Sequence, residues 1–415
     1  MRFATGDEVG VFKVVDVEVG TDTARSAAES AQVKTHKRPN RQSCVQVMTF
    51  VPDFKGAPAI ALGRKGHIVE VWSFEGMVLH TWRDDAGEED EDDAYVCMET
   101  QHTILTTCTA RGRATFRSLN YTKKWYTKDL GGGEQSVSCL RMDPDFTMYL
   151  PMCPGAVAVG GKENDLTIWE NNASNCDDMN DVREYDMTLA FEARNVKDDE
   201  LSLRVPVWVS DIQFIERYPA QGYYVAVCTR YRHVRIYDAD KSRRPVISVE
   251  VGDSPLVSML LGNNWGEFYL SDSHGKVFCY STLEKRILYQ FKGGTGAVTG
   301  LASKDNTLAT VSLDRYLRAY DTKTHEMTAK VFLETKMTSV AVLESAYSPS
   351  EHKEDKEEEE EDVLRGLEDV EHGFTNPLAQ DPSNIQSEDE EDSEDDSAES
   401  LEEVDDYSAK RRRVT

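Results

Sequence analysis

Long apolar runs are missing from this sequence, and so is the spacing of a surface helix. No stretch reaches the roughly 18 apolar residues of a transmembrane helix. No apolar run follows Met1, Arg2 and Phe3, as a secretory signal would require. Apolar residues almost never recur at the three-four spacing of a helix. We therefore expect a soluble, intracellular protein without membrane contact, built from strands.

Paired cysteines and metal-binding patterns are also absent. The eight cysteines are scattered, no C-x-x-C occurs, and several lie in apolar runs such as residues 225–228. This usage predicts buried thiols in a reducing compartment rather than disulfides or a zinc site. The nine histidines form neither H-x-H nor H-E-x-x-H. We expect no metal and no cofactor.

Catalytic motifs are lacking as well. No G-x-S-x-G nucleophile elbow occurs. Residues 155–162 superficially resemble a phosphate loop, but Gly161 stands where the motif requires lysine, so we interpret them as a strand that runs into a turn. A propeller glycosidase with paired carboxylates remains an alternative, because such pairs are set by three-dimensional separation. No pair is singled out, so we predict that the protein is not an enzyme.

Acidic charge is abundant but unevenly distributed. The chain has a net charge of −28, of which residues 351–415 contribute −19 through 26 acidic and 7 basic residues. Residues 84–93 add eight acidic residues and no basic one. The rest of the chain is nearly neutral. Runs of like charge repel each other and stay solvated, so we expect both acidic segments to be disordered.

A repeated pattern fills the first 345 residues: a polar turn, then an alternating strand that ends in an aromatic residue. The copies occupy residues 6–12, 65–72, 111–116, 163–169, 230–237, 273–280 and 313–320. The closing aromatics of the last three lie 43 and 40 residues apart, the length of a four-stranded propeller blade. Longer spacings earlier in the chain indicate blades with insertions.

Seven copies predict an all-β, seven-bladed propeller over residues 1–345, followed by a disordered acidic tail over residues 346–415. A closed ring lets each blade bury its faces against its neighbours. Ring closure needs both ends of the propeller in one sheet, so we expect residues 2–18 to pair with strands near 308–343. Two packed β-sandwiches are the alternative, but they do not explain the aromatic-ended repeat.

Residues 191–209 contain the strongest candidates for partner contact. Pro206 cannot donate to a central ladder, which indicates an extended loop or edge there, and we interpret Trp208 as a core residue.

Arg235 and Arg318 occupy matching strand positions, either solvated or in a binding patch, and Asp314 is expected to be a structural turn residue. Cations are common at protein and nucleic-acid interfaces. The candidate partner- or RNA-binding residues are Arg194, Asn195, Lys197, Arg204, Arg230, Arg232, Arg315 and Arg318.

Three further segments carry predictions. A basic loop at residues 34–41 suits either phosphate contact or solvation, through Lys34, Lys37, Arg38 and Arg41. The cluster at the end of the tail is typical of a nuclear-import signal, made of Lys410, Arg411, Arg412 and Arg413. Ser387 and Ser393 are each followed by three acidic residues, the context of an acidophilic kinase.

Three stretches resemble one family of nucleolar WD-repeat factors that associate with large-subunit precursors, also called the Nop-seven-associated protein family. They are EARNVKDDELSLRVPVW at residues 192–208, LDRYLRAYD at residues 313–321 and VGTDT at residues 19–23. The resemblance spans residues 9–343. Tyr-Asp replaces the generic Trp-Asp at residues 237–238 and 320–321, and Gly66-His67 lies in a turn. These departures affect the expected blade boundaries.

The resemblance implies a binding platform in assembly of the large ribosomal subunit, located in the nucleus and nucleolus. It implies contact with the large-subunit precursor particle, with other assembly factors and with ribosomal RNA, and release by an AAA-type ATPase. Outside the particle we expect a monomer. A propeller adaptor in a chromatin or ubiquitin-ligase complex is the alternative, and an enzyme on a propeller is a weaker one.

Overall fold

The computed structural model consists almost entirely of β-strands. It describes residues 1–24, 31–37, 40–84, 93–131, 136–144, 155–171, 185–198, 201–215 and 222–345. Contacts divide the chain into Met1–Glu351 and His352–Thr415, and the described strands all belong to the first unit. The predicted tail and the centre of the acidic loop lie outside the described residues. No helix within the described ranges is long and apolar enough to cross a membrane.

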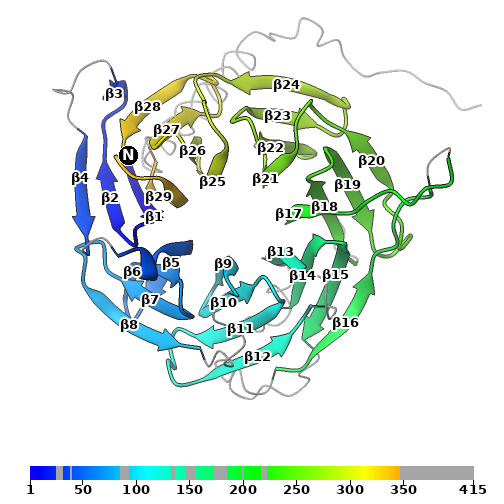
Figure 1. Ribbon diagram of the computed structural model, residues 1–415, viewed down its shortest axis with the longest axis horizontal. Coiled ribbons are helices and arrows are strands. Elements are labelled where there is room, and N and C mark those ends of the chain that lie inside the picture. The colour runs from blue at the N-terminus through cyan, green and yellow to red at the C-terminus, as the bar shows by residue number, and fades with distance from the viewer. Residues whose placement is uncertain are drawn as a thin grey trace, which may run out of the picture. The chain divides into compact units, whose positions relative to one another are not determined.

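Seven antiparallel sheets form a ring of blades, numbered I to VII along the chain (Figure 1). From the inner to the outer strand, blade I contains β29 (Met337–Glu344), β1 (Arg2–Asp7), β2 (Phe12–Asp16) and β4 (Gln32–His36). Blade II contains β5 (Val45–Phe54), β6 (Ala57–Arg64), β7 (Ile68–Trp72) and β8 (Val78–Arg83), and blade III contains β9 (Tyr95–Gln101), β10 (Ile104–Thr109), β11 (Arg113–Ser118) and β12 (Trp125–Asp129). A short 3-10 helix, η1 (Arg41–Ser43), precedes blade II.

The remaining four blades repeat this order. Blade IV contains β13 (Ser136–Met142), β14 (Ala156–Lys162), β15 (Asn164–Asn171) and β16 (Met187–Glu192), and blade V contains β17 (Val209–Phe214), β18 (Tyr224–Thr229), β19 (His233–Asp238) and β20 (Ile247–Glu250). Blade VI contains β21 (Leu256–Leu261), β22 (Glu267–Asp272), β23 (Val277–Ser281) and β24 (Arg286–Phe291). Blade VII contains β25 (Val298–Lys304), β26 (Thr307–Ser312), β27 (Tyr316–Asp321) and β28 (Met327–Phe332), and β3 (Thr21–Asp22) pairs with β28 in parallel as a fifth strand.

The aromatic-ended repeat corresponds to the third strand in six of the seven blades, and the seven sheets confirm the predicted seven-bladed propeller. Trp72, Trp169 and Tyr320, for example, lie on β7, β15 and β27. Phe12 differs because it is the first residue of β2 rather than one near its end. The spacing of 60 residues between Phe12 and Trp72 therefore overstates the distance between equivalent positions of blades I and II.

Ring closure joins the two ends of the propeller in blade I, as predicted. β1 pairs antiparallel with β29, with Phe3 opposite Val342. The buried Lys13 on β2 donates to the Leu333 carbonyl and, over 2.8 Å, to the Thr335 hydroxyl. The parallel addition of β3 to blade VII was not predicted, because its two residues are too short for an alternation pattern.

The hydrophobic core lies between neighbouring blades. One cluster, for example, joins Phe268 and Leu270 of blade VI to Ala226 and Ile236 of blade V. Each of the other clusters likewise spans two adjacent blades. The six cysteines within the described residues are free thiols, and four of them are buried, as expected. Both faces of a blade are therefore covered by its neighbours.

This packing corrects one expectation for the matching arginines Arg235 and Arg318. Both were expected at a solvated or partner-facing surface, but they are only 1% and 2% exposed. Arg318 forms an ion pair with Asp314, whose carboxylate also accepts hydrogen bonds from the Tyr316 backbone at 3.1 Å and from the Thr295 hydroxyl at 2.8 Å. Asp314 is thus a structural turn residue, as predicted, and Arg318 is its buried partner.

The Asp314→Asn variant should be less stable than the wild type by about 2 kcal/mol near pH 6, because a hydrogen-bonded charge is lost. Burial raises the pKa of the Asp314 carboxyl, but its hydrogen bonds outweigh burial and hold the pKa below its ordinary value. A depressed folded-state pKa contributes stability above the unfolded pKa of about 3.9 and loses it as the pH falls further. In urea unfolding, the difference in unfolding free energy between the two proteins should become smaller from pH 6 to pH 3. A constant gap would contradict this.

Candidate functional site

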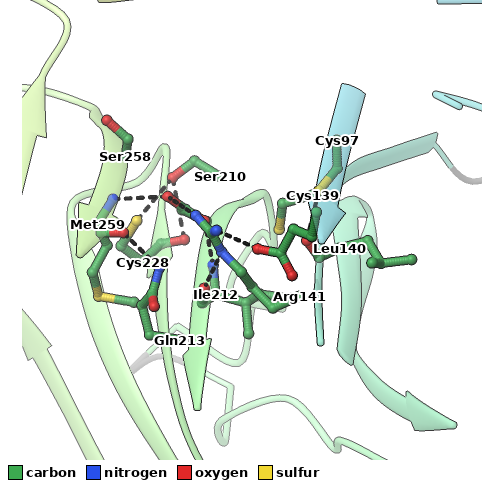
Figure 2. Close-up of polar contacts among 12 residues, drawn as sticks. Cys97, Cys139, Leu140, Arg141, Ser210, Ile212, Gln213, Cys228, Ser258 and Met259 are labelled. Atoms are coloured by element: carbon green, nitrogen blue, oxygen red, sulfur yellow. Dashed lines mark hydrogen bonds and ion pairs between the residues drawn. The ribbon is translucent and has the colours of Figure 1, made fainter. Parts of the chain in front are cut away.

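Three ionisable residues, Glu99, Arg141 and Asp211, form an ion network among three inner strands. Arg141 on β13 forms ion pairs with Glu99 on β9 and, at 3.1 Å, with Asp211 on β17. Its Nε donates to the Ile212 carbonyl over 3.0 Å (Figure 2). Each carboxylate also accepts a backbone N–H of the next inner strand, from Met142 at 2.7 Å and from Met259 at 2.9 Å.

This inner-strand ion network is structural. Burial raises the pKa of Glu99, and the nearby arginine only partly opposes it. Burial lowers the pKa of Arg141, but the two carboxylates outweigh burial and hold its pKa well above the ordinary value. Perturbed pKa values occur at active sites but also in structural ion pairs. Because the charges here are used to connect blades III to VI, we place the functional site elsewhere.

The segment from residue 193 to residue 208 leaves the sheets between β16 and β17, as predicted around Pro206. In Figure 1 the green chain between these strands extends outside the ring before it returns to β17. Backbone hydrogen bonds hold its two ends to blade IV, from Ala193 to the Leu166 carbonyl at 2.8 Å and from Glu163 to the Val207 carbonyl at 2.9 Å. The segment is therefore an anchored loop on the rim.

A groove of about 530 Å³ lies between this segment and the third and fourth strands of blade IV. We call it the blade IV–V groove. Apolar side chains, including Trp169 and Leu189, line it together with three arginines, Arg194, Arg204 and Arg243. The lining residues are Leu130, Gly131, Glu163, Asn164, Asp165, Leu166, Thr167, Trp169, Leu189, Glu192, Ala193, Arg194, Asn195, Arg204 and Arg243. Its volume and mixed lining are typical of ligand sites.

Two of the three groove arginines are paired with carboxylates of blade IV. Arg204, whose side chain is 64% exposed, contacts Glu163 at 3.0 Å, and Arg243 contacts Glu192 at 2.6 Å. Ion pairs this exposed contribute little and exchange easily. Arg194 donates its backbone N–H, and among the described residues its side chain has no ion pair. The groove therefore offers one unengaged guanidinium and two exchangeable ones.

Polar residues beneath the groove hold the segment in place. Asn195 donates to the Val205 carbonyl over 2.6 Å and accepts from buried Arg235 at 3.2 Å. Tyr237 donates to Asp165 over 3.0 Å. Asn195 was predicted as a contact residue, but its amide is already used inside the protein. It positions the segment that carries Arg194 and Arg204.

Trp208 is not the core residue that we expected. It is half-buried and belongs to none of the hydrophobic clusters. Lys162 lies 5.3 Å and the guanidinium of Arg230 lies 5.9 Å from its ring centroid. Trp208 therefore gathers two cations at the base of the segment through cation–π contacts. Residues 155–162 form β14 and the start of a turn, as predicted, rather than a phosphate loop.

The other predicted contact residues are not brought to the groove. Arg232 pairs with Glu250 in blade V. Arg315 is exposed in blade VII, where its guanidinium lies 5.3 Å from the Phe332 ring centroid. Lys197 is exposed on the segment but lies outside the groove lining. Buried Arg318 cannot contact a partner without breaking its ion pair, so we remove it from the candidate set.

The predicted basic loop belongs to blades I and II, on other blades than the groove. Lys34 on β4 and Arg41 on η1 are exposed, and Lys37 contacts Glu70 at 3.3 Å. Arg38 lies outside the described residues, as do the tail residues Ser387, Ser393, Lys410, Arg411, Arg412 and Arg413. The described side chains include no group of three histidine, cysteine, aspartate or glutamate residues able to hold a metal ion.

Sequence reasoning found Arg194 and Arg204 but missed Lys162, Leu189 and Arg243. Arg243 reaches the groove from the β19–β20 connection, about 50 residues after Arg194 in the chain. No local pattern links the two. Leu189 could have been predicted as a contact residue, because it is an apolar residue on the final strand of a blade and that strand has one open edge.

Comparison with curated proteins shows similarity over most of the chain. The chain is 27% identical over 392 residues to "Ribosome biogenesis protein nsa1" of Schizosaccharomyces pombe, covering 89% of this chain and 97% of that protein. It is 26% identical over 406 residues to "Ribosome biogenesis protein NSA1" of Yarrowia lipolytica, covering 89% and 94%. "WD repeat-containing protein 74" of Homo sapiens is 28% identical over 320 residues, covering 76% and 74%. No family model matches the chain.

Among solved structures, the computationally designed Ika8 protein is similar with a TM-score of 0.53 and 14% sequence identity. The match covers 81% of this chain and 86% of that one. At this level of identity the similarity concerns the fold alone.

Proposed function

Because the chain belongs to the family of WD-repeat ribosome biogenesis proteins, we propose that it is a non-enzymatic platform in assembly of the large ribosomal subunit. It has a role in ribosome assembly. We propose that it binds the large-subunit precursor particle through the rim of blades IV and V. Other assembly factors and ribosomal RNA are its partners there, and an AAA-type ATPase releases it.

The observation that carries this proposal is the anchored segment at residues 193–208. It combines exposed cations with exposed apolar side chains, since Leu201 and Leu203 are 78% and 60% exposed. Arginine and aromatic residues are enriched at protein interfaces, and cations supply the phosphate contacts of RNA-binding surfaces. Rigid anchoring to blade IV lowers the cost of ordering this surface on binding.

Co-purification tests the proposal. Tagged full-length protein should recover precursor ribosomal RNA of the large subunit together with assembly factors, and this recovery should persist after washing at moderate salt. Recovery of histones or of cullin-type ubiquitin-ligase subunits, without precursor RNA, would instead support an adaptor in another nuclear complex. A monomeric elution volume is expected for the isolated protein.

We further propose that the protein acts in the nucleus and nucleolus, and that Lys410, Arg411, Arg412 and Arg413 form its import signal. Changing these four residues to alanine should lower nuclear enrichment several-fold. The melting temperature should stay within about 1 °C, because none of the blade strands contains these residues. Fluorescence microscopy of tagged protein and thermal unfolding measure the two effects. Unchanged nuclear enrichment would place the signal elsewhere.

A further inference from the structure

We propose that the blade IV–V groove binds a short, extended peptide of a partner protein, in which an apolar side chain lies next to an aspartate or glutamate. This inference rests on the proposed function and specifies the chemistry of one partner. Three properties of the groove support it: an apolar floor, unused hydrogen-bonding groups along it, and an unengaged guanidinium at its rim.

The apolar floor selects an apolar side chain. Leu189 lines the groove from the outer strand β16 and is 49% exposed, and Trp169 lies opposite it on the neighbouring strand β15. Exposed apolar surface of this kind commonly marks a protein contact. Leu201 and Leu203 are exposed apolar residues of the segment that borders the groove, but they do not line it. Burying a peptide side chain of leucine size against Leu189 and Trp169 removes apolar surface from water and so favours binding.

Unused hydrogen-bonding groups suit the backbone of that peptide. Asn164 lines the groove and is only 5% exposed, yet its amide nitrogen has no hydrogen-bond partner. Oδ2 of the neighbouring Asp165 also accepts no hydrogen bond, although it forms a long ion pair with the Arg235 guanidinium at 3.9 Å. A donor and an acceptor on adjacent residues match the C=O and N–H of an extended chain. Leaving such groups unpaired is unfavourable, and a bound peptide that pairs with them offsets this cost.

The charges of the groove favour an acidic peptide over RNA. Its lining contains three arginines but also three carboxylates, Glu163, Asp165 and Glu192. A phosphate backbone would meet these carboxylates along its length. One acidic side chain needs only a single guanidinium, and Arg194 is the one without an ion pair among the described residues. A carboxylate held by arginine in two parallel hydrogen bonds is a strong and directional contact.

The test begins with phage-displayed random 12-residue peptides, selected on the full-length wild-type protein and depleted on the Leu189→Arg variant. Leu189→Arg should fold normally, because the side chain is exposed. Ile287→Arg is the matched control, since Ile287 is 40% exposed on the outer strand β24 of another blade. The selected peptides should share an apolar residue next to aspartate or glutamate.

A synthetic peptide of the selected sequence is then measured by fluorescence anisotropy. Its Kd should rise at least about tenfold with Leu189→Arg and stay unchanged with Ile287→Arg. Arg194→Gln in the protein and acid-to-amide exchange in the peptide should each weaken binding about fivefold. Combining both changes should cost no more than either alone, because they remove the same contact.

Three outcomes would overturn the inference. In the first, no selected peptide binds the wild type more tightly than Leu189→Arg. In the second, a 20-nucleotide oligouridine RNA binds the wild type but not Leu189→Arg, which makes the groove an RNA site. In the third, peptides bind only after residues 351–415 are deleted, which makes the chain's own tail the occupant. Co-purification with precursor RNA is measured separately, so the proposed function survives any of these results.

Discussion

Changing Arg194, Lys197 and Arg204 together to glutamate should reduce recovery of large-subunit precursors by about tenfold or more. The three cations lie on one anchored segment, and their side chains are exposed. Reversal places three negative charges against an RNA or acidic protein surface, and like charges at an interface cost several kcal/mol. Since about 1.4 kcal/mol corresponds to a tenfold change in Kd, a tenfold loss is a conservative expectation.

Folding of the triple variant should be nearly unaffected. Arg204 loses only an exposed ion pair with Glu163, which contributes little. The matched control reverses Lys285, Lys292 and Lys323, which are also exposed but lie on blades VI and VII. The two variants and the wild type are pulled down side by side, with precursor RNA and assembly factors quantified. Equal recovery of all three, with equal melting temperatures, would move the binding surface to another part of the ring.

Replacing Arg141 by methionine should destabilise the propeller by about 3 kcal/mol near pH 7. The substitution leaves Glu99 and Asp211 close together and largely shielded from water without their shared cation. Removing one partner of a buried ion pair costs about 3–5 kcal/mol, and the partial exposure of Arg141 argues for the lower end. Because Arg141 contacts neighbours in blades III and V, the whole ring should unfold at lower urea concentration in one transition.

The pH dependence separates lost charge pairing from lost packing. Burial already raises the pKa of Glu99, and loss of Arg141 raises it further. A carboxyl whose folded-state pKa is raised contributes stability at low pH and loses it as the pH rises through that pKa. The loss of unfolding free energy in Arg141→Met, relative to the wild type, should therefore be smaller at pH 5 than at pH 7. Adding Glu99→Gln and Asp211→Asn should restore part of the stability. A pH-independent deficit that both additions leave intact would assign the effect to packing.

Several predictions depended on local patterns that the fold could not change. The alternation of apolar residues and the closing aromatic identified the third strand of blades II to VII, because a strand's side chains point alternately to its two faces. Pro206 correctly indicated a loop, since proline lacks the N–H that a central ladder needs. The turn role of Asp314 was also local, because it accepts a backbone N–H two residues ahead.

Exposure was harder to predict than strand position. Arg235 and Arg318 were expected at a surface because arginine in an alternating strand usually points to solvent. In a closed ring, however, both faces of each blade are covered by neighbours, and β27 is buried along most of its length. Trp208 shows the opposite error. Its ring is held by Lys162 and Arg230 at the edge of blades IV and V, although a tryptophan beside a valine-rich run suggested core.

Local sequence patterns were enough to predict the number of blades, the closure of the ring by its two ends and the segment that carries Arg194 and Arg204. These features follow from short-range alternation, turn residues and one proline, which act within about ten residues. Which of the predicted arginines are exposed, and which are buried, depends instead on how the blades pack. The groove joins Glu163, Glu192 and Arg243 from three separate elements. Their proximity depends on how blade V packs against blade IV, and no local pattern encodes that packing.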